Sequence, residues 1–311
     1  MGAGEGQSEV FAPGMLRGQV ALVTGGGTGL GKATALELAR CGAAVTIVGR
    51  REHVLAEAAA EIGEAVGGEA VGGEAAGGEA AGSDAAGGDT PGGDGGDVDW
   101  LTGDVRERAE AERLVRATLE RRGRLDLLVN NAGGQFFSPA ELIAPRGWRA
   151  VWRLNVEGTL NMAEAAFELA LGPAGAGTVV NITLSPHHGM PGMAHSGAAR
   201  AAVEALTREL AGRWREAGVV VTAVAAGHFD TEVLAKYPAT VRAGASRTVP
   251  LQRLGEASEH AWLVALLASP LGRAFNGSTI TLDGARDNWC GPWPPAGLAD
   301  EAGEVPVEER R

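Results

Sequence analysis

The stretch Thr24-Gly25-Gly26-Gly27-Thr28-Gly29-Leu30-Gly31 decides the fold predicted for this chain. An apolar run at 20–23 (VALV) precedes it and a helical run at 32–40 (KATALELAR) follows it, which gives the order strand, glycine turn, helix. Glycines have no Cβ, and the first N–H groups of a helix attract anions, so such a turn can hold a pyrophosphate. We therefore expect a dinucleotide cradle made by Thr24, Gly25, Thr28, Gly29, Leu30 and Gly31.

Composition and charge fit a globular protein and exclude several other classes. The 311 residues are 45% hydrophobic, which is enough for one large domain with a buried core. The net charge of −12 comes mostly from residues 61–99, which hold ten acidic and no basic residues, and the rest of the chain carries 29 acidic against 27 basic residues. This near balance gives no support for binding to nucleic acid or to a membrane surface.

The cysteines and the chain ends bear on the compartment. Cys41 and Cys290 cannot form a disulfide framework and lack the spacing of metal ligands, so no metal site is expected. No apolar run is long enough for a membrane span, and the chain does not begin with a signal-peptide pattern. The end Glu309-Arg310-Arg311 is not a peroxisomal address. We therefore expect a cytoplasmic protein.

Strand and helix patterns alternate along the chain. Strands are predicted at 44–48, 98–101, 125–129, 179–182, 219–224 and 278–284, and helices at 33–39, 52–62, 106–122, 148–171 and 196–214. This alternation predicts a single α/β domain over residues 15–284, a Rossmann-type doubly wound parallel sheet of about seven strands, with its ligand at the carboxyl ends of the strands. Residues 1–14 form an N-terminal arm, and residues 285–311 form an irregular tail.

One segment has a composition unlike the rest. Residues 63–96 repeat GGEAA and GGEAV units and then become rich in Gly and Asp, with no aromatic residue. Such a segment buries too little apolar surface to offset its chain entropy. We expect a disordered insertion between the second helix and the third strand.

The end of the second strand bears on cofactor choice. In sheets of this kind a carboxylate at that point hydrogen-bonds the 2′-OH of the adenosine ribose, whereas this strand ends in Gly49-Arg50-Arg51. Arg50 could instead form a forked contact with a 2′-phosphate. The sequence therefore favours NADP(H) over NAD(H).

The pattern TGxxxGxG, together with Asn130-Asn131-Ala132-Gly133 after a later strand, resembles the short-chain dehydrogenase/reductase superfamily. The resemblance implies that Asp104 and Val105 contact the adenine, and that Asn131, Ala132 and Gly133 form a wall of the cofactor site. It also implies that Asn155 organises a catalytic water and that Gly227 and Thr231 lie at the nicotinamide. The proline usual before that glycine is Ala226 here.

The catalytic residues usual in this superfamily are altered. The tyrosine and the lysine four residues after it are replaced by Ser196 and Arg200, and the only tyrosine, Tyr237, is elsewhere. Arg200 can still hold the nicotinamide ribose as a cation, but the Ser196 alcohol is too weak an acid to replace a phenol. The serine expected after the fifth strand is also uncertain in position, because either Leu184 or Ser185 occupies it, with Ser185 as the catalytic candidate.

Longer stretches, among them Gly133-Gly134-Gln135-Phe136 and residues 195–200 (HSGAAR), resemble the trans-2-enoyl-CoA reductases of peroxisomes. Residues 24–32 (TGGGTGLGK) equally resemble the 2,4-dienoyl-CoA reductases. The resemblance implies NADPH-dependent reduction of the C=C bond of an enoyl thioester, with an acyl-CoA as the small-molecule substrate. It also implies a homo-oligomer, a tetramer or a dimer.

Two other functions are left open by the sequence. The first is an alcohol or ketone oxidoreductase with a different acid, for which the candidates are His187, His188, His195 and His228. The second is a cofactor-binding protein without turnover. In each case, residues 232–250, the variable segment after the sixth strand, are expected to cover the substrate site as a lid.

Overall fold

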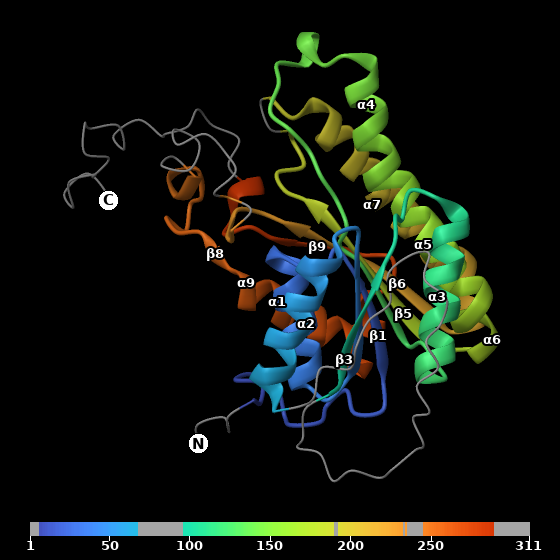
Figure 1. Cartoon of the computed structure of the whole chain (residues 1–311). Coiled ribbons are helices and arrows are strands. Elements are labelled where there is room, and N and C mark those ends of the chain that lie inside the picture. The colour runs from blue at the N-terminus through green and yellow to red at the C-terminus, as the bar shows by residue number, and fades with distance from the viewer. Residues whose placement is uncertain (1–5, 68–95, 190–191, 233, 235–244, 289–311) are drawn as a thin grey trace.

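The fold is built on a seven-stranded parallel sheet with helices on both faces (Figure 1). The computed structural model describes residues 6–67, 96–189, 192–232, 234 and 245–288. The strand order of the seven-stranded sheet is β3-β2-β1-β4-β5-β6-β9. The strands are β1 Val20–Thr24, β2 Ala44–Gly49, β3 Val98–Thr102, β4 Leu127–Asn130, β5 Gly177–Leu184, β6 Val219–Ala226 and β9 Thr279–Leu282. The predicted doubly wound α/β fold of about seven strands is confirmed.

Helices divide between the two faces of the sheet as the right-handed crossovers require. One face is covered by α1 Gly29–Arg40, α2 Glu52–Val66 and α9 Ala257–Ala268, and the other by α3 Arg108–Arg122, α5 Gly158–Ala166 and α7 Ala194–Trp214. The sequence patterns predicted all of these except α9, which is hydrophobic almost throughout and so lacks a clear amphipathic period. Its start is fixed by a capping box between Glu256 and Glu259.

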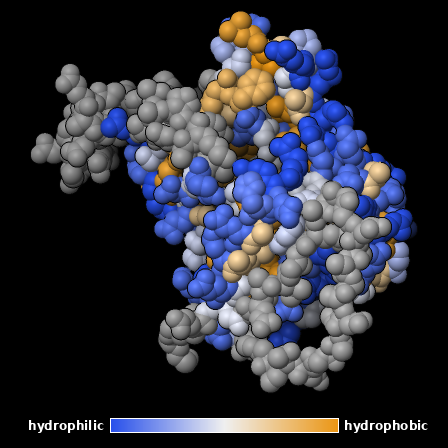
Figure 2. Space-filling model, viewed as in Figure 1, coloured by the Kyte–Doolittle hydropathy of each residue, from blue (hydrophilic) through white to orange (hydrophobic). Residues whose placement is uncertain are grey.

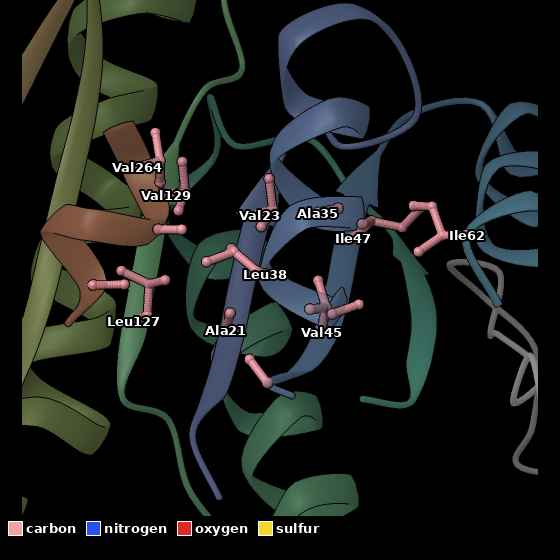
Figure 3. Close-up of a cluster of buried hydrophobic side chains, with 14 of the residues drawn as sticks. Ala21, Val23, Ala35, Leu38, Val45, Ile47, Ile62, Leu127, Val129 and Val264 are labelled. Carbon is pink, nitrogen blue, oxygen red and sulfur yellow. The ribbon is translucent and has the colours of Figure 1, made fainter. Parts of the chain in front are cut away.

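The buried strands explain the apolar runs in the sequence, because a sheet covered on both faces needs apolar side chains on both. Every residue of β1 and of β6 is buried. Figure 3 shows one of the two cores, in which Val23 of β1 and Ile47 of β2 lie beside Ala35 and Leu38 of α1. This packing holds the glycine turn between β1 and α1 in place.

The helix predicted at 148–171 is longer and less regular than predicted. It begins with α4 Pro145–Trp152, continues through α5 and ends with α6 Gly172–Ala174. The segments between them, Arg153–Glu157 and Phe167–Leu171, are π-helical turns, η2 and η3. The backbone stays helical across each junction, so the irregularity is a local widening of one continuous helix rather than a break.

One predicted boundary needs correction. The insertion was placed from residue 63, but α2 continues to Val66, because Ile62 and Val66 both bury their side chains against the sheet, and the helix ends at Gly67 with φ +70°. The rest of the predicted disorder, residues 68–95, lies outside the described residues. The N-terminal arm is anchored by Ser8, whose buried hydroxyl donates to the carboxylate of Glu37 in α1.

Short elements complete the described chain. A second sheet pairs β7 Phe229–Asp230 with β8 Gly255–Glu256. The 3-10 turns are η1 Ala140–Leu142, η4 Arg215–Ala217, η6 Ser246–Thr248, η7 Pro270–Phe275 and η8 Arg286–Asn288. Of the predicted lid, residues 233 and 235–244 lie outside the described residues, as does the tail from 289.

Candidate active site

The glycine turn after β1 is locked to the end of β4 by hydrogen bonds. The Thr24 hydroxyl accepts from the backbone N–H groups of Asn131 at 3.1 Å and Ala132 at 3.0 Å. The Asn131 amide donates to the carbonyl oxygens of Thr24 at 3.1 Å and Gly25 at 3.2 Å. A Cβ on Gly31 would lie 2.3 Å from both the Asn131 Nδ2 and the Gly25 carbonyl oxygen, so only glycine fits there. Thr24 and Asn131 thus build the cradle.

A pocket opens beside this turn at the carboxyl ends of β1, β2, β3 and β4. Seven of the predicted cofactor residues line it: Gly25, Thr28, Arg50, Asp104, Val105, Ala132 and Gly133. Leu30 continues from the turn into α1 and is half-buried against the core. An open pocket reached by bare glycine backbone fits the adenosine and pyrophosphate of a dinucleotide, which the cradle residues and Arg50 would hold.

Arg106 is a residue of this pocket region that the sequence reading missed. Its Nε donates to both carboxylate oxygens of Asp104, at 2.8 and 3.0 Å, and its backbone N–H donates to one of them at 3.1 Å. These hydrogen bonds hold the pKa of Asp104 below its usual value. Asp104 therefore stays ionised and fixed in direction, which suits a carboxylate that accepts from an adenine amino group.

Asn155 is fully buried and lies in the π-helical turn η2. Its amide donates to the carbonyl oxygens of Val151 at 2.7 Å and Gly134 at 2.9 Å, and its Oδ1 accepts from the Gly134 N–H at 3.2 Å. The widened turn frees the Val151 carbonyl for the side chain, and π-turns are frequent at functional sites. Asn155 thereby ties the long helix to the segment that follows β4.

Arg200 and Ser196 lie one turn apart on α7, near the start of the helix. Arg200 Nη1 donates to the Ile182 carbonyl oxygen at 2.7 Å. A Cβ on Gly133 would lie 2.3 Å from Arg200 Nη2 and 2.8 Å from Asn155 Oδ1, so the guanidinium, Asn155 and the predicted cofactor wall meet at this glycine. The Ser196 hydroxyl is buried and donates to Gln135 Oε1 at 3.3 Å.

Gln135 is a second residue that the sequence reading did not assign to the site, although the stretch that contains it was singled out.

Ser185 comes directly after β5, whose last residue is Leu184. Its buried hydroxyl donates to the carboxylate of Asp283, which also accepts the Asp287 N–H at 2.7 Å. The catalytic candidate Ser185 is therefore bound to the segment after β9 by a partner that sequence spacing does not reveal.

The histidines named as possible acids have different surroundings. His187 lies between two carboxylates, with Nδ1 at 2.5 Å from Asp287 and Nε2 at 3.0 Å from Glu204. Burial opposes the charged form of His187, but the hydrogen bond to Asp287 and the charge of Glu204 outweigh it and raise the pKa of His187. His188 Nδ1 is 3.4 Å from Asp287.

The other two histidines are kept neutral. His195 is buried, and its ring centroid lies 4.3 Å from that of Phe136 and 6.0 Å from that of Trp148. Burial lowers the pKa of His195 and also that of His228. Only His195 among the four adjoins Ser196 in the chain, so it is the histidine closest in sequence to the altered catalytic pair.

The segment after β6 also contacts the glycine turn. Gly227 N–H donates to the Leu282 carbonyl oxygen at 3.0 Å, and Thr231 is half-buried. The next residue, Glu232, accepts the N–H of Gly29 with its Oε1 at 2.6 Å. The sequence predicted Glu232 only as the first residue of the lid, 232–250, and not as a contact of the glycine turn.

Sequence models of two protein families match the chain. The one described as "Enoyl-(Acyl carrier protein) reductase" matches residues 90–285, and the one described as "short chain dehydrogenase" matches residues 19–76. The chain belongs to the short-chain dehydrogenase/reductase family. It is an oxidoreductase of that family, whose members use NAD(P)(H), and the resemblance predicted from the glycine turn is confirmed.

Relatives of this short-chain dehydrogenase/reductase include 2,4-dienoyl-CoA reductases. The peroxisomal 2,4-dienoyl-CoA reductase of Arabidopsis thaliana is 32% identical over 88% of this chain and 86% of its own, and a probable 2,4-dienoyl-CoA reductase of Bacillus subtilis is 32% identical over 88% and 97%. Among solved structures, a citronellol catabolism dehydrogenase of Pseudomonas aeruginosa is 38% identical with a TM-score of 0.72, covering 89% of this chain and 98% of its own.

Neither the long helix from α4 to α6 nor any other helix in the described ranges is apolar over the length needed to cross a bilayer. In the same ranges, no three side chains of His, Cys, Asp or Glu gather as ligands for a metal ion.

Proposed function

We propose that this protein is an NADPH-dependent reductase that reduces the C=C bond of an enoyl thioester. The observation that carries the proposal is the replacement of the family's phenol and lysine by Ser196 and Arg200, with the Arg200 guanidinium against Gly133 beside Asn155. The names of the relatives support the same substrate class.

The chemistry fits these residues. A bound nicotinamide would supply hydride to Cβ of the enoyl group, which leaves negative charge on the thioester oxygen and requires a proton at Cα. Arg200 provides a fixed positive charge near the cofactor wall, and such preorganised charge is a large source of transition-state stabilisation. A phenol aimed at a carbonyl oxygen is not needed, which agrees with a serine at that position.

The apolar surface beside the site suits an acyl chain. Figure 2 shows hydrophobic side chains gathered over α4, and the exposed ones in this region are Phe136, Phe137, Leu142, Trp148 and Trp152. Phe136 follows Gln135, which accepts the Ser196 hydroxyl, so the apolar surface begins at the altered catalytic pair. We infer that the acyl chain of the substrate runs over Phe136.

NADP(H) is the proposed cofactor form. Arg50 is exposed, lines the pocket and comes after Gly49, where a carboxylate for the ribose 2′-OH would otherwise stand. Its guanidinium also acts on Asp104, where it favours the ionised carboxylate. A cation at this end of the pocket favours a 2′-phosphate.

Reduction or oxidation at an alcohol carbon is the second candidate. It is favoured by the 38% identity to a citronellol catabolism dehydrogenase and by the 31% identity to a 3-oxoacyl-[acyl-carrier-protein] reductase of Synechocystis. In the direction of alcohol oxidation, the neutral imidazole of His195, next to Ser196, would be the base that accepts the alcohol proton. Loss of turnover, with the cofactor retained, is the remaining candidate.

One experiment separates the three functions. NADPH oxidation is followed with crotonyl-CoA and with a 2,4-dienoyl-CoA, and NADP⁺ reduction is followed with citronellol and with a 3-hydroxyacyl thioester. Turnover of the enoyl or dienoyl thioesters supports the proposal. Turnover of the alcohols alone supports the second candidate, and cofactor binding without turnover supports the third.

Compartment and assembly are also proposed. We infer a cytoplasmic enzyme. Several relatives are named as peroxisomal forms, so fluorescence microscopy of a tagged chain is needed to test this inference. We also infer a homo-oligomer, a dimer or a tetramer. Sedimentation of the purified protein measures that state directly.

A further inference from the structure

Glu232, in the segment after β6, contacts the glycine turn that follows β1. Its Oε1 accepts the N–H of Gly29 at 2.6 Å, although the two residues are 203 positions apart in the chain. Gly29 is the first residue of α1, and its φ is +55°. The carboxylate therefore sits on a backbone donor at the N-terminus of the helix that follows the cradle.

This end of α1 has few other negative partners among the described residues. The first turn of α1 contains no acidic residue, and Thr28 at the N-cap position makes no side-chain capping bond. The turn does contain a cation, Lys32, and the carboxylate paired with it belongs to Glu61 of α2. The Glu232 carboxylate thus lies at the positive end of the helix dipole, where an anion stabilises the helix.

The same N-terminus is where a dinucleotide of this family places its pyrophosphate. The pocket beside it is lined by Gly27 and Thr28 of the turn. A carboxylate and a pyrophosphate cannot occupy one set of N–H donors together, and at close range the two anions repel each other. Binding of the cofactor therefore requires Glu232 to leave Gly29.

We propose that Glu232 is an internal competitor of the cofactor pyrophosphate and so sets the affinity of this enzyme for NADP(H). Its side chain takes the place of a phosphate at Gly29 until the cofactor displaces it. The residue before it, Thr231, is the one expected at the nicotinamide, so the displacement acts on the segment that also meets the reactive end of the cofactor. The inference rests on dinucleotide binding and not on which substrate is reduced.

The test measures binding of NADPH by its fluorescence in wild type, Glu232→Gln, Glu232→Ala and the control Asp230→Asn. Asp230 is exposed, belongs to the same segment and loses the same charge on substitution. Removing the competing carboxylate should tighten NADPH binding about 2- to 5-fold in both Glu232 variants, the range expected for one anion at an exposed helix N-terminus. NADH should gain by the same factor, because it carries the same pyrophosphate.

A second probe isolates the pyrophosphate. Adenosine 2′-monophosphate has the adenine and the 2′-phosphate but no pyrophosphate, so its affinity should not change in the Glu232 variants. The melting temperature without cofactor should fall slightly in Glu232→Ala, since α1 loses its cap, while the rise produced by NADPH should become larger. These readouts do not depend on catalytic turnover.

Three results would overturn the inference. Wild-type or weaker NADPH affinity in both Glu232 variants would mean that the carboxylate does not compete with the cofactor. An equal gain in Asp230→Asn would make the effect one of overall charge. Tighter binding of adenosine 2′-monophosphate would place the effect away from the pyrophosphate. An inactive enzyme that still shows the predicted NADPH gain would refute the proposed reductase function and leave this inference standing.

Discussion

Arg200 differs from the lysine it replaces because it cannot lose its proton near neutral pH. It can therefore hold charge near the developing enolate oxygen but cannot relay a proton to Ser196. Arg200→Ala should lose on the order of 10²-fold in kcat, whereas Ser196→Ala should retain most of the activity, since its hydroxyl is bound to Gln135. Steady-state kinetics with an enoyl-CoA measures both variants.

Two controls accompany these variants. Cofactor affinity and melting temperature are measured on the same samples, because the hydrogen bond from Arg200 to the Ile182 carbonyl oxygen also supports the fold. A folded Arg200→Ala enzyme with full turnover would remove Arg200 from the mechanism. An inactive Ser196→Ala enzyme would point to carbonyl chemistry through that hydroxyl.

Arg50 should decide between the two cofactors. Arg50→Ala is expected to weaken NADPH binding by about 1.5 to 3 kcal/mol, the range for a hydrogen bond to a charged group, and to leave NADH nearly unchanged. Isothermal titration with each cofactor gives the comparison, and Arg51→Ala serves as the neighbouring control. Equal losses for NADPH and NADH would show that Arg50 does not contact the 2′-phosphate.

Single residues of the site were predictable to the extent that they lie in continuous motifs. Thr24, Asn131 and Gly133 come from such motifs; in the structure Asn131 is hydrogen-bonded to Thr24, and Gly133 lies against Arg200 and Asn155. Asp283 and Glu232 could not be found in this way, because their partners, Ser185 and Gly29, are set by how distant segments meet. No local pattern in the sequence encodes that meeting.

At the scale of elements, periodicity predicted most strands and helices, and the failures have physical causes. Helix α9 is apolar on nearly all sides and offers no period to detect. The π-turn η2 arises where the Asn155 side chain takes the Val151 carbonyl oxygen, a local exchange of hydrogen bonds that leaves the hydrophobic period almost intact. The hydrophobic period therefore predicts the helix but not the π-helical turn within it.

His187 links two elements, helix α7 through Glu204 and turn η8 through Asp287. Its pKa is raised from 6.5 in the folded protein, so its contribution to stability is complete below about pH 6.5 and is lost as the pH rises through the folded-state value. The pKa of Asp287 is lowered from 3.8: burial alone would raise it, but the hydrogen bonds from His187 prevail. The contribution of Asp287 is therefore lost only as the pH falls through that lower value.

This linkage predicts a pH-dependent effect of one substitution. His187→Gln should lower the melting temperature more at pH 5.5 than at pH 8.5, because only at the lower pH does the wild-type imidazolium stabilise the fold. Scanning calorimetry at the two pH values measures it. His188→Gln is the matched control, since His188 approaches Asp287 alone, and an equal loss at both pH values in His187→Gln would contradict the assignment.

At the scale of the whole molecule, the strand order follows from chain order and from the handedness of crossovers, which is why the fold could be predicted from the sequence. Substrate identity could not, because no local pattern in the sequence encodes the shape of the exposed apolar surface around Phe136, over which we propose that the acyl chain runs. The insertion is the remaining large feature, and it adds only loop-closure entropy if its composition governs its behaviour.

Two replacements test the insertion. Exchanging residues 68–95 for a short Gly/Ser linker should keep the melting temperature within about 2–4 °C of wild type, the shift that about 1 kcal/mol produces in a domain of this size. Exchanging 63–96 should cost more, because it also removes the last turn of α2 with buried Val66 and the Gly96 N–H that donates to the Ala39 carbonyl oxygen at 2.9 Å. A collapse of stability in the shorter replacement would show that the segment packs against the domain, contrary to its composition.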